Sequence, residues 1–213
     1  VRAFAGCTAL QTVMIMTDIS SIDAYAFAGC TALQSLYFLE SVEEIGNYAF
    51  YGCSALSSID ITNGVVTIGN FAFAECSNLI GIQLGNKLET IGESAFENCS
   101  NIRTFVISSE LEEIKNSAFA GCINIVEYYL LYCSDIPTIG SNVFSGIHKD
   151  CKIFVPELLY DEWIETENWA DYARYIAPYD AVNYGLFDSA GQQVYTWEQL
   201  VANEDVKLNE QHE

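Results

Sequence analysis

Apolar residues return along this chain with a period of 23 residues. The clearest column is a phenylalanine at six positions spaced by that step, followed by a seventh after 25 residues: Phe4, Phe27, Phe50, Phe73, Phe96, Phe119 and Phe144. A cysteine lies three residues after each of the first six: Cys7, Cys30, Cys53, Cys76, Cys99 and Cys122. A repeat this short is one supersecondary unit that cannot bury its own apolar face, so the period predicts a stack of coils.

Spacing within each unit predicts its local structure. Ile59 and Ile61 are separated by one residue, which is typical of a short strand with one buried face. The same pair recurs in every unit and predicts one strand per coil, in a parallel sheet along the stack. The Ala-Phe-x-x-Cys stretch has three- and four-residue spacing, which predicts a single helical or 3₁₀ turn on the opposite wall. Gly29 and Gly46, with their equivalents, are interpreted as tight corners.

The module, as it stands from Ile45 to Leu56 and in the neighbouring units, resembles the leucine-rich repeats of the BspA type. Such repeats occur in bacterial surface proteins and in some protist ones. The resemblance covers about residues 1–148 and implies a right-handed leucine-rich-repeat solenoid with one short parallel strand per 23-residue coil. The family often places Pro just after the strand, and its absence here predicts a less rigid turn. The residues at that position are Met16, Leu39, Thr62, Gly85, Ser108 and Leu131.

Three parts are expected along the chain. Residues 1–148 hold six full coils and a partial one, and residues 149–178 depart from the period. An open-ended solenoid needs a cover over its last coil, so 149–178 is predicted to be a C-terminal cap rich in large aromatic side chains. A binding site for aromatic ligands is the alternative interpretation of those side chains. Residues 179–213 form a small further segment that is predicted to be partly disordered.

Within the C-terminal third, local patterns predict individual elements. Residues 153–156 are typical of a last strand closed by proline, and residues 157–164 and 170–176 are predicted to be helical. A hairpin is predicted over 185–195, followed by a short helix that begins with the capping box at Thr196.

Charge excludes whole classes of partner. The chain of 213 residues has 29 acidic and 8 basic residues, a formal net charge of −21. Nucleic-acid binding requires a basic surface, and anionic membranes repel an acidic one, so neither partner is expected. No apolar run approaches the ~20 residues of a membrane span, so we expect no membrane insertion. The chain opens inside a repeat at Val1 and shows no signal peptide, so we expect that residues upstream have been removed.

The cysteines do not follow a metal-binding or disulfide pattern. Residues one period apart lie above one another, so the six cysteines from Cys7 to Cys122 are predicted to form a buried column of reduced thiols beside the phenylalanines. Zinc requires paired short spacings such as C-x-x-C, and the sequence has none. Cys133 and Cys151 lie outside the column, where a disulfide between them and two free thiols both remain open.

Catalytic residues are not found. The two histidines, His148 and His212, have no partner carried by the repeats, so neither a Ser-His-Asp nor a Cys-His arrangement is expected. Acidic residues in equivalent turns are interpreted as a solvated face, with a calcium site as the alternative. They are Glu43, Glu44, Glu112 and Glu113. We therefore expect no enzyme activity, no cofactor and no metal.

Function is expected on the outward side of the strands. Two groups of apolar residues stand out there as candidate binding residues: Met14, Met16, Tyr37 and Leu39 in one, and Tyr129 and Leu131, beside Val126, in the other. Exposed apolar clusters tend to mark interaction surfaces. The alternative is that upstream coils cover the first group and the cap covers the second.

Two functions follow from this surface and from the resemblance. The first is a secreted or cell-surface interaction protein that adheres to host proteins, glycoconjugates or other cells. The second is a structural spacer or display module of a longer surface protein, without a ligand of its own. A binding protein should have a non-random patch on the exposed strand face, and a spacer should not.

Overall fold

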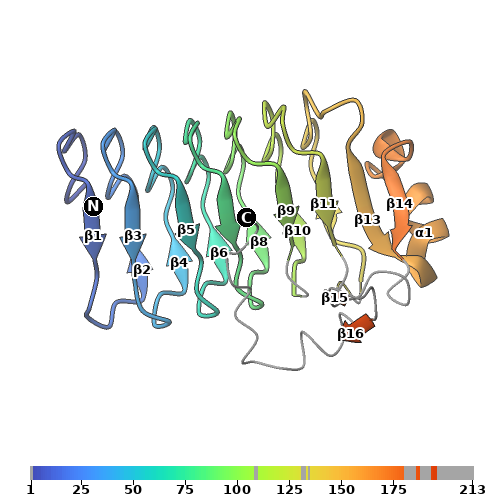
Figure 1. Cartoon of the computed structure of the whole chain (residues 1–213), viewed down its shortest axis with the longest axis horizontal. Coiled ribbons are helices and arrows are strands. Elements are labelled where there is room, and N and C mark those ends of the chain that lie inside the picture. The colour runs from blue at the N-terminus through green and yellow to red at the C-terminus, as the bar shows by residue number, and fades with distance from the viewer. Residues whose placement is uncertain are drawn as a thin grey trace.

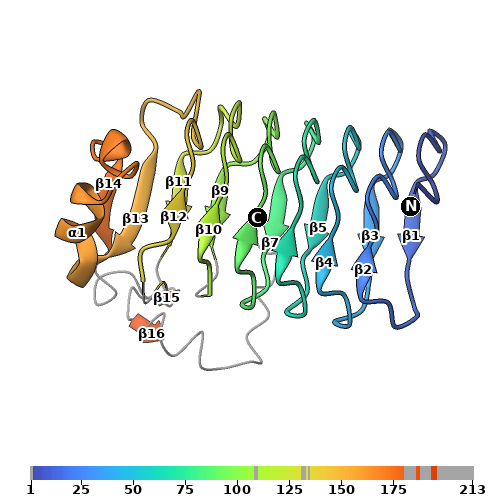
Figure 2. The same cartoon turned by 180° about the vertical axis from the view of Figure 1, so that it is seen from behind.

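The computed structural model of the protein describes residues 2–107, 110–130, 133, 135–179, 186–187 and 193–195. The coils stack side by side into an elongated slab, with the first coil at one end and the C-terminal cap at the other (Figure 1). The two rows of strands lie on different walls, as the view from behind shows (Figure 2).

One row consists of three-residue strands. They are β1 (Thr12–Met14), β3 (Ser35–Tyr37), β5 (Ser58–Asp60), β7 (Gly81–Gln83), β9 (Thr104–Val106) and β11 (Glu127–Tyr129). Paired strands are parallel and in register by the sequence repeat, so that Met14 lies opposite Tyr37 and Ile59 opposite Ile82. The predicted solenoid of stacked parallel strands is thereby confirmed.

The structure adds a second row of strands that was not predicted. They are β2 (Ser21–Ile22), β4 (Glu44–Ile45), β6 (Thr67–Ile68), β8 (Thr90–Ile91), β10 (Glu113–Ile114) and β12 (Thr138–Ile139), and they form one parallel sheet. Each has only two residues, which is too short for an alternating pattern to be visible in the sequence. In the sequence, the single buried isoleucine of each of these strands cannot be told apart from the last residue of a loop.

Phenylalanine rings form a continuous column through the core. Successive rings from Phe4 to Phe144 are nearly parallel, with centroids 5.1–5.8 Å apart. The five inner rings are at most 2% exposed: Phe27, Phe50, Phe73, Phe96 and Phe119. Such contacts add to the free energy gained from burying the rings.

Of the six cysteines predicted to form a buried column, five are buried, and the prediction is wrong for Cys7, which is exposed in the first coil. The column also has hydrogen bonds that its spacing alone did not reveal. Each thiol donates to the carbonyl oxygen of the phenylalanine in the preceding coil, at 3.0–3.2 Å, in Cys30, Cys53, Cys76, Cys99 and Cys122. Burial raises the pKa of Cys53 and Cys122 to about 12, so these thiols remain protonated and unreactive. Cys133 and Cys151 are also buried, and neither forms a disulfide, so the open alternative of a disulfide between them is wrong.

The turn wall is built from alternating hydrogen bonds and not from the predicted helical turn. In the second coil, every other N–H donates to the next coil: Tyr25 to Asn47, Phe27 to Ala49, and Gly29 to Tyr51. The N–H groups between them donate to the carbonyl three residues back. A helix would direct every N–H along its own coil and leave the neighbouring coil without partners. The alternation requires positive φ at Tyr25 and Gly29, which are at +60° and +72°.

Corner residues have two further structural roles. A Cβ on Gly46 would lie 2.7 Å from the backbone nitrogen of Ala24, so the close approach of two coils requires glycine there. The side-chain oxygen of Asn47 accepts the N–H of Asn70 in the next coil at 2.7 Å. These polar residues therefore stabilise the stack and are not candidates for binding.

The last coil continues into a segment with several short elements. They are β13 (Lys152–Pro156), the 3₁₀ helix η1 (Glu157–Leu159), α1 (Tyr160–Glu165), the 3₁₀ helix η2 (Ala170–Tyr172) and β14 (Ile176–Tyr179). The helix predicted over 157–164 is confirmed. The helix predicted over 170–176 is wrong beyond Tyr172, because Ile176 pairs in parallel with Ile153 and adds a strand to the sheet. The last strand of the stack is therefore β14 and not β13.

This segment covers the end of the phenylalanine column. The ring of Trp169 lies 5.9 Å from that of Phe144, and its Nε1–H donates to the carbonyl of Pro137 at 2.8 Å. Trp163 and Trp169 are both 0% exposed, so these rings are core and not a site for aromatic ligands.

The predicted hairpin near the C-terminus is present as two paired strands. β15 (Leu186–Phe187) and β16 (Gln193–Tyr195) pair antiparallel. The turn between them, the helix predicted after Thr196 and the disorder predicted for the last ten residues lie outside the described residues.

Candidate interaction surface

An exposed apolar patch lies on and just after β1 and β3, the first two of the three-residue strands. Met14 and Tyr37 are opposite one another on β1 and β3 and are 64% and 57% exposed. Met16 and Leu39 follow two residues later and are also exposed. Because strand residues alternate, Val13 and Leu36 point to the core while these four point outward. We name Met14, Met16, Tyr37 and Leu39 the N-terminal patch.

The second candidate group lies in a different environment. Tyr129 is half-buried, with its ring stacked on that of Phe154 at 5.0 Å and edge-on to that of Tyr179 at 6.2 Å. Both partners belong to the cap strands, so the cap shields Tyr129 as the alternative interpretation predicts. Val126 is also half-buried, and Leu131 lies outside the described residues.

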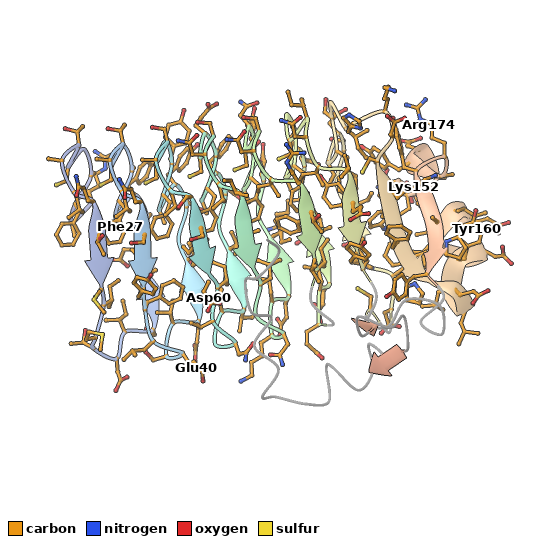
Figure 3. All side chains as sticks on the ribbon, in the orientation of Figure 1. Phe27, Glu40, Asp60, Lys152, Tyr160 and Arg174 are labelled. Atoms are coloured by element: carbon orange, nitrogen blue, oxygen red, sulfur yellow. The ribbon has the colours of Figure 1, made fainter. Side chains whose placement is uncertain are left out.

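The strand face between these groups is more polar. Asp60 of β5 occupies the position that Met14 and Tyr37 hold in the first two coils, and it is exposed (Figure 3). Val106 of β9 is exposed at the same position and lies opposite the half-buried Tyr129. Among the described residues of this face, the apolar cluster that lies open is Met14, Met16, Tyr37 and Leu39, at its N-terminal end.

The turn wall carries a half-buried aromatic column that was not predicted. The rings of Tyr25, Tyr48 and Phe71 stack with centroids 4.8 Å apart, and the guanidinium of Arg2 lies 4.8 Å above Tyr25. Its signal was an aromatic residue two positions before the phenylalanine in three successive units. Because the rings cover one another's faces, this column presents edges and not a flat platform to solvent.

Acidic residues do not gather into a metal site in the part of the chain that the structure describes. No group of three or more His, Cys, Asp or Glu residues there is arranged to hold a metal ion. Glu43, Glu44 and Glu112 are exposed on the coil edge, and Glu113 pairs with Lys115 at 3.6 Å. The calcium alternative thus finds no clustered set of ligands among these residues.

The described residues also contain no helix that is both long and apolar enough to cross a membrane. Of the two histidines, His148 accepts the N–H of Asp150 through Nδ1 at 3.2 Å, and His212 lies outside the described residues.

The parallel strands, the 23-residue register and the columns of Phe and Cys define a leucine-rich-repeat solenoid. The model of the BspA type leucine rich repeat region matches residues 1–126 in six copies. This chain belongs to that family. A search of curated proteins found no match to the sequence.

Solved structures agree with this assignment. The chain is similar to a leucine-rich repeat protein of T. pallidum, with 27% identity, a TM-score of 0.64, and 76% of this chain and 72% of the other covered. It is also similar to a leucine-rich repeat protein of Bacteroides ovatus, with 24% identity, a TM-score of 0.50, and coverage of 83% and 56%. A leucine-rich repeat protein of Eubacterium ventriosum matches at 23% identity and a TM-score of 0.55, with coverage of 64% and 43%. The chain therefore spans about half the length of the latter two proteins.

Proposed function

We propose that this protein is a non-enzymatic interaction protein, secreted or displayed at a bacterial surface, which binds a protein or glycan partner through the N-terminal patch. The observation that carries the proposal is the exposure of four apolar side chains on two adjacent strands. Monomeric proteins rarely expose such clusters unless another molecule contacts them.

Geometry favours a partner with a broad surface over a small substrate. The patch lies on a sheet face whose strands are held by neighbouring coils, and such faces suit the extended contacts of macromolecular interfaces. Met14 and Tyr37 also have the side-chain types that are enriched at such contacts. The surface location rests on the membership in a family found in bacterial surface proteins.

Charge points to the kind of partner. With a net charge of −21, the protein attracts basic molecules and repels acidic ones. We therefore expect a partner whose contact surface is basic around an apolar centre. Association should weaken as salt rises, because exposed charges are screened over about 10 Å at 0.1 M ionic strength.

A spacer or display module remains the second candidate. The observation that favours it is the polar centre of the strand face, where Asp60 replaces the apolar residues of the first coils, together with the cover over Tyr129. A spacer needs a rigid stack and no ligand.

A binding experiment separates the two. The intact protein is screened against arrays of matrix proteins and glycans, and each binder is retested with the double variant Met14→Ala, Tyr37→Ala. We expect the variant to lose about tenfold or more in affinity and to keep its melting temperature, since truncating central interface residues costs of the order of 1–2 kcal/mol.

The matched control is Ile80→Ala with Ile123→Ala, which removes two apolar side chains that are also more than half exposed. It should leave affinity unchanged. Equal losses in both double variants would contradict the assignment to the N-terminal patch. No binder in any array would favour the spacer.

A further inference from the structure

A hollow of about 320 Å³ lies where the last repeat coil meets the cap. It is lined by Lys149, Asp150, Cys151, Lys152, Arg174 and Tyr175. Lys152 opens β13, and Arg174 precedes β14, so the two side chains come from neighbouring coils, in the upper part of the cap end in Figure 3. Nothing in the proposed function uses this place.

The repeat pattern is interrupted at this hollow. The residue six positions after each phenylalanine is buried in the preceding coils, as in Leu79, Ile102 and Ile125. After Phe144 the equivalent residue is Asp150, which is exposed, and the buried residue is Cys151. The N–H of Cys151 donates to the carbonyl of His148 at 2.9 Å, which closes a turn that directs Asp150 outward. Cys151 thus takes the buried position, and the charged side chain of Asp150 lies at the hollow.

Cations gather around this corner in an otherwise acidic protein. Three of the eight lysines and arginines of the chain line it. Lys149 pairs with Asp150 at 3.0 Å. Lys152 and Arg174 have no ion pair within the described residues, although Glu127 lies beside Lys152 in the register of β11 and β13. The positive charges of Lys149, Lys152 and Arg174 outnumber the negative charges of Asp150 and Glu127, so the corner has a net positive charge.

Arg174 and Lys152 are both exposed, and contacts with Tyr175 orient the guanidinium of Arg174. This guanidinium lies 4.5 Å from the ring centroid of Tyr175 and donates to the hydroxyl of that residue. Tyr175 is itself buried and gives the arginine a fixed support. A planar guanidinium with free N–H groups matches the geometry of oxyanions and binds them through two parallel hydrogen bonds.

We propose that this hollow is a binding site for a small oxyanion of the sulfate or phosphate class, either free or carried on a sugar. Lys152 and Arg174 supply the charge, and the guanidinium supplies the directed hydrogen bonds. Long polyanions are excluded because the remaining surface of a chain with a net charge of −21 repels them. The volume is at the lower end of the roughly 300–1,000 Å³ range of ligand pockets, which fits one anionic group or one sulfated sugar.

The test is a titration of ¹⁵N-labelled protein with sodium sulfate and with sodium phosphate, followed by NMR, against sodium chloride at equal ionic strength. We expect saturable shifts of the amides of residues 149–152 and 174–175 with either oxyanion. In the variant Lys152→Gln, Arg174→Gln the dissociation constant should rise about tenfold or more, as expected for lost charge-assisted hydrogen bonds. The control Lys87→Gln, Lys115→Gln makes the same change in net charge away from the hollow and should alter it less than about twofold.

Two sugars identify the source of the anion. If N-acetylglucosamine 6-sulfate binds more tightly than sulfate, the ligand of the site is a sulfated glycan. If it binds equally or more weakly, the ligand is a free oxyanion. Both results support the site. Absence of saturable shifts with sulfate and phosphate, equal binding of unsulfated N-acetylglucosamine, or an equal loss in both double variants would overturn it. If the Lys152→Gln, Arg174→Gln variant does not fold, the unsubstituted protein alone provides the test. Saturable shifts confined to residues 149–152 and 174–175 then support the site, and shifts elsewhere overturn it.

Discussion

The first coil and a central coil have the same repeat residues in different surroundings. Phe4 and Phe73 occupy one position of the module, yet Phe4 is 44% exposed and Phe73 is 0% exposed. Cys7 is likewise exposed, whereas Cys76 is buried. The local sequence does not account for the difference, because both coils contain the same Ala-Phe-x-x-Cys stretch. A coil in a solenoid buries its apolar residues against its neighbours, so burial depends on having one on each side.

The opposite end of the stack shows what replaces a missing neighbour. Phe144 ends the ring column, but Trp169 and Tyr172 pack on it, and its ring is 1% exposed. The same cover reaches Tyr129 on the strand face and removes it from the candidate surface. Among the described residues, none covers the N-terminal patch in this way, and its four side chains are exposed.

The largest expected effect is at the centre of the stack. Phe73→Ala should lower the free energy of unfolding by about 3–5 kcal/mol, since it removes a fully buried ring and leaves a cavity. Phe4→Ala should lower it by less than about 2 kcal/mol, because that ring already contacts water. Urea denaturation of both variants measures the difference. Equal losses would contradict the idea that neighbouring coils determine the contribution of this residue.

A smaller effect is expected at the cap. Trp169→Phe keeps an aromatic ring but removes the hydrogen bond to the carbonyl of Pro137. We expect a loss of about 1–3 kcal/mol, because the buried acceptor loses its partner and part of the packing. The control Tyr160→Phe changes a half-buried aromatic of α1 and should have little effect. A neutral result for Trp169→Phe in thermal denaturation would show that the hydrogen bond to Pro137 does not stabilise the cap.

The cysteine column should respond less. We expect Cys76→Ser and Cys76→Ala each to lower the free energy of unfolding by about 1–2 kcal/mol. Serine should be no worse than alanine, because its hydroxyl can donate to the carbonyl of Phe50 as the thiol does. The sequence alone predicts that serine is the worse of the two, since it buries a hydroxyl with no assured partner. If serine proves more destabilising than alanine by over about 2 kcal/mol, the thiol hydrogen bond has no counterpart in the variant.

The smallest perturbation is chemical labelling of the native protein. Cys7 should react readily with a thiol reagent near neutral pH, while the buried cysteines should react only after unfolding. Burial holds the pKa of Cys53, Cys122, Cys133 and Cys151 at about 12, so almost no thiolate is present at that pH. Counting thiols by mass spectrometry before and after denaturation measures this. Rapid labelling of Cys76 would indicate that the centre of the stack opens.

The fold was largely predictable and the site only in part. Two apolar residues of one strand, such as Ile59 and Ile61, recur at a fixed period. This recurrence predicts a stacked parallel sheet, because residues with the same spacing must be buried in the same way in each coil. The spacing also identified Tyr37 as outward-facing. It did not distinguish Tyr37 from Tyr129, since the ring that covers Tyr129 comes from Phe154, outside the repeat.

What the sequence by itself determined is therefore the module: its length, its strand, and which side chains face the core. What only the tertiary structure decided are the contacts between coils. They include the thiol bonds to phenylalanine carbonyls, the alternating bonds of the turn wall, and the hollow where the last repeat coil meets the cap. The physical reason is that a periodic pattern defines the surroundings of an average coil, while the ends and the irregular coil depend on neighbours that follow no period.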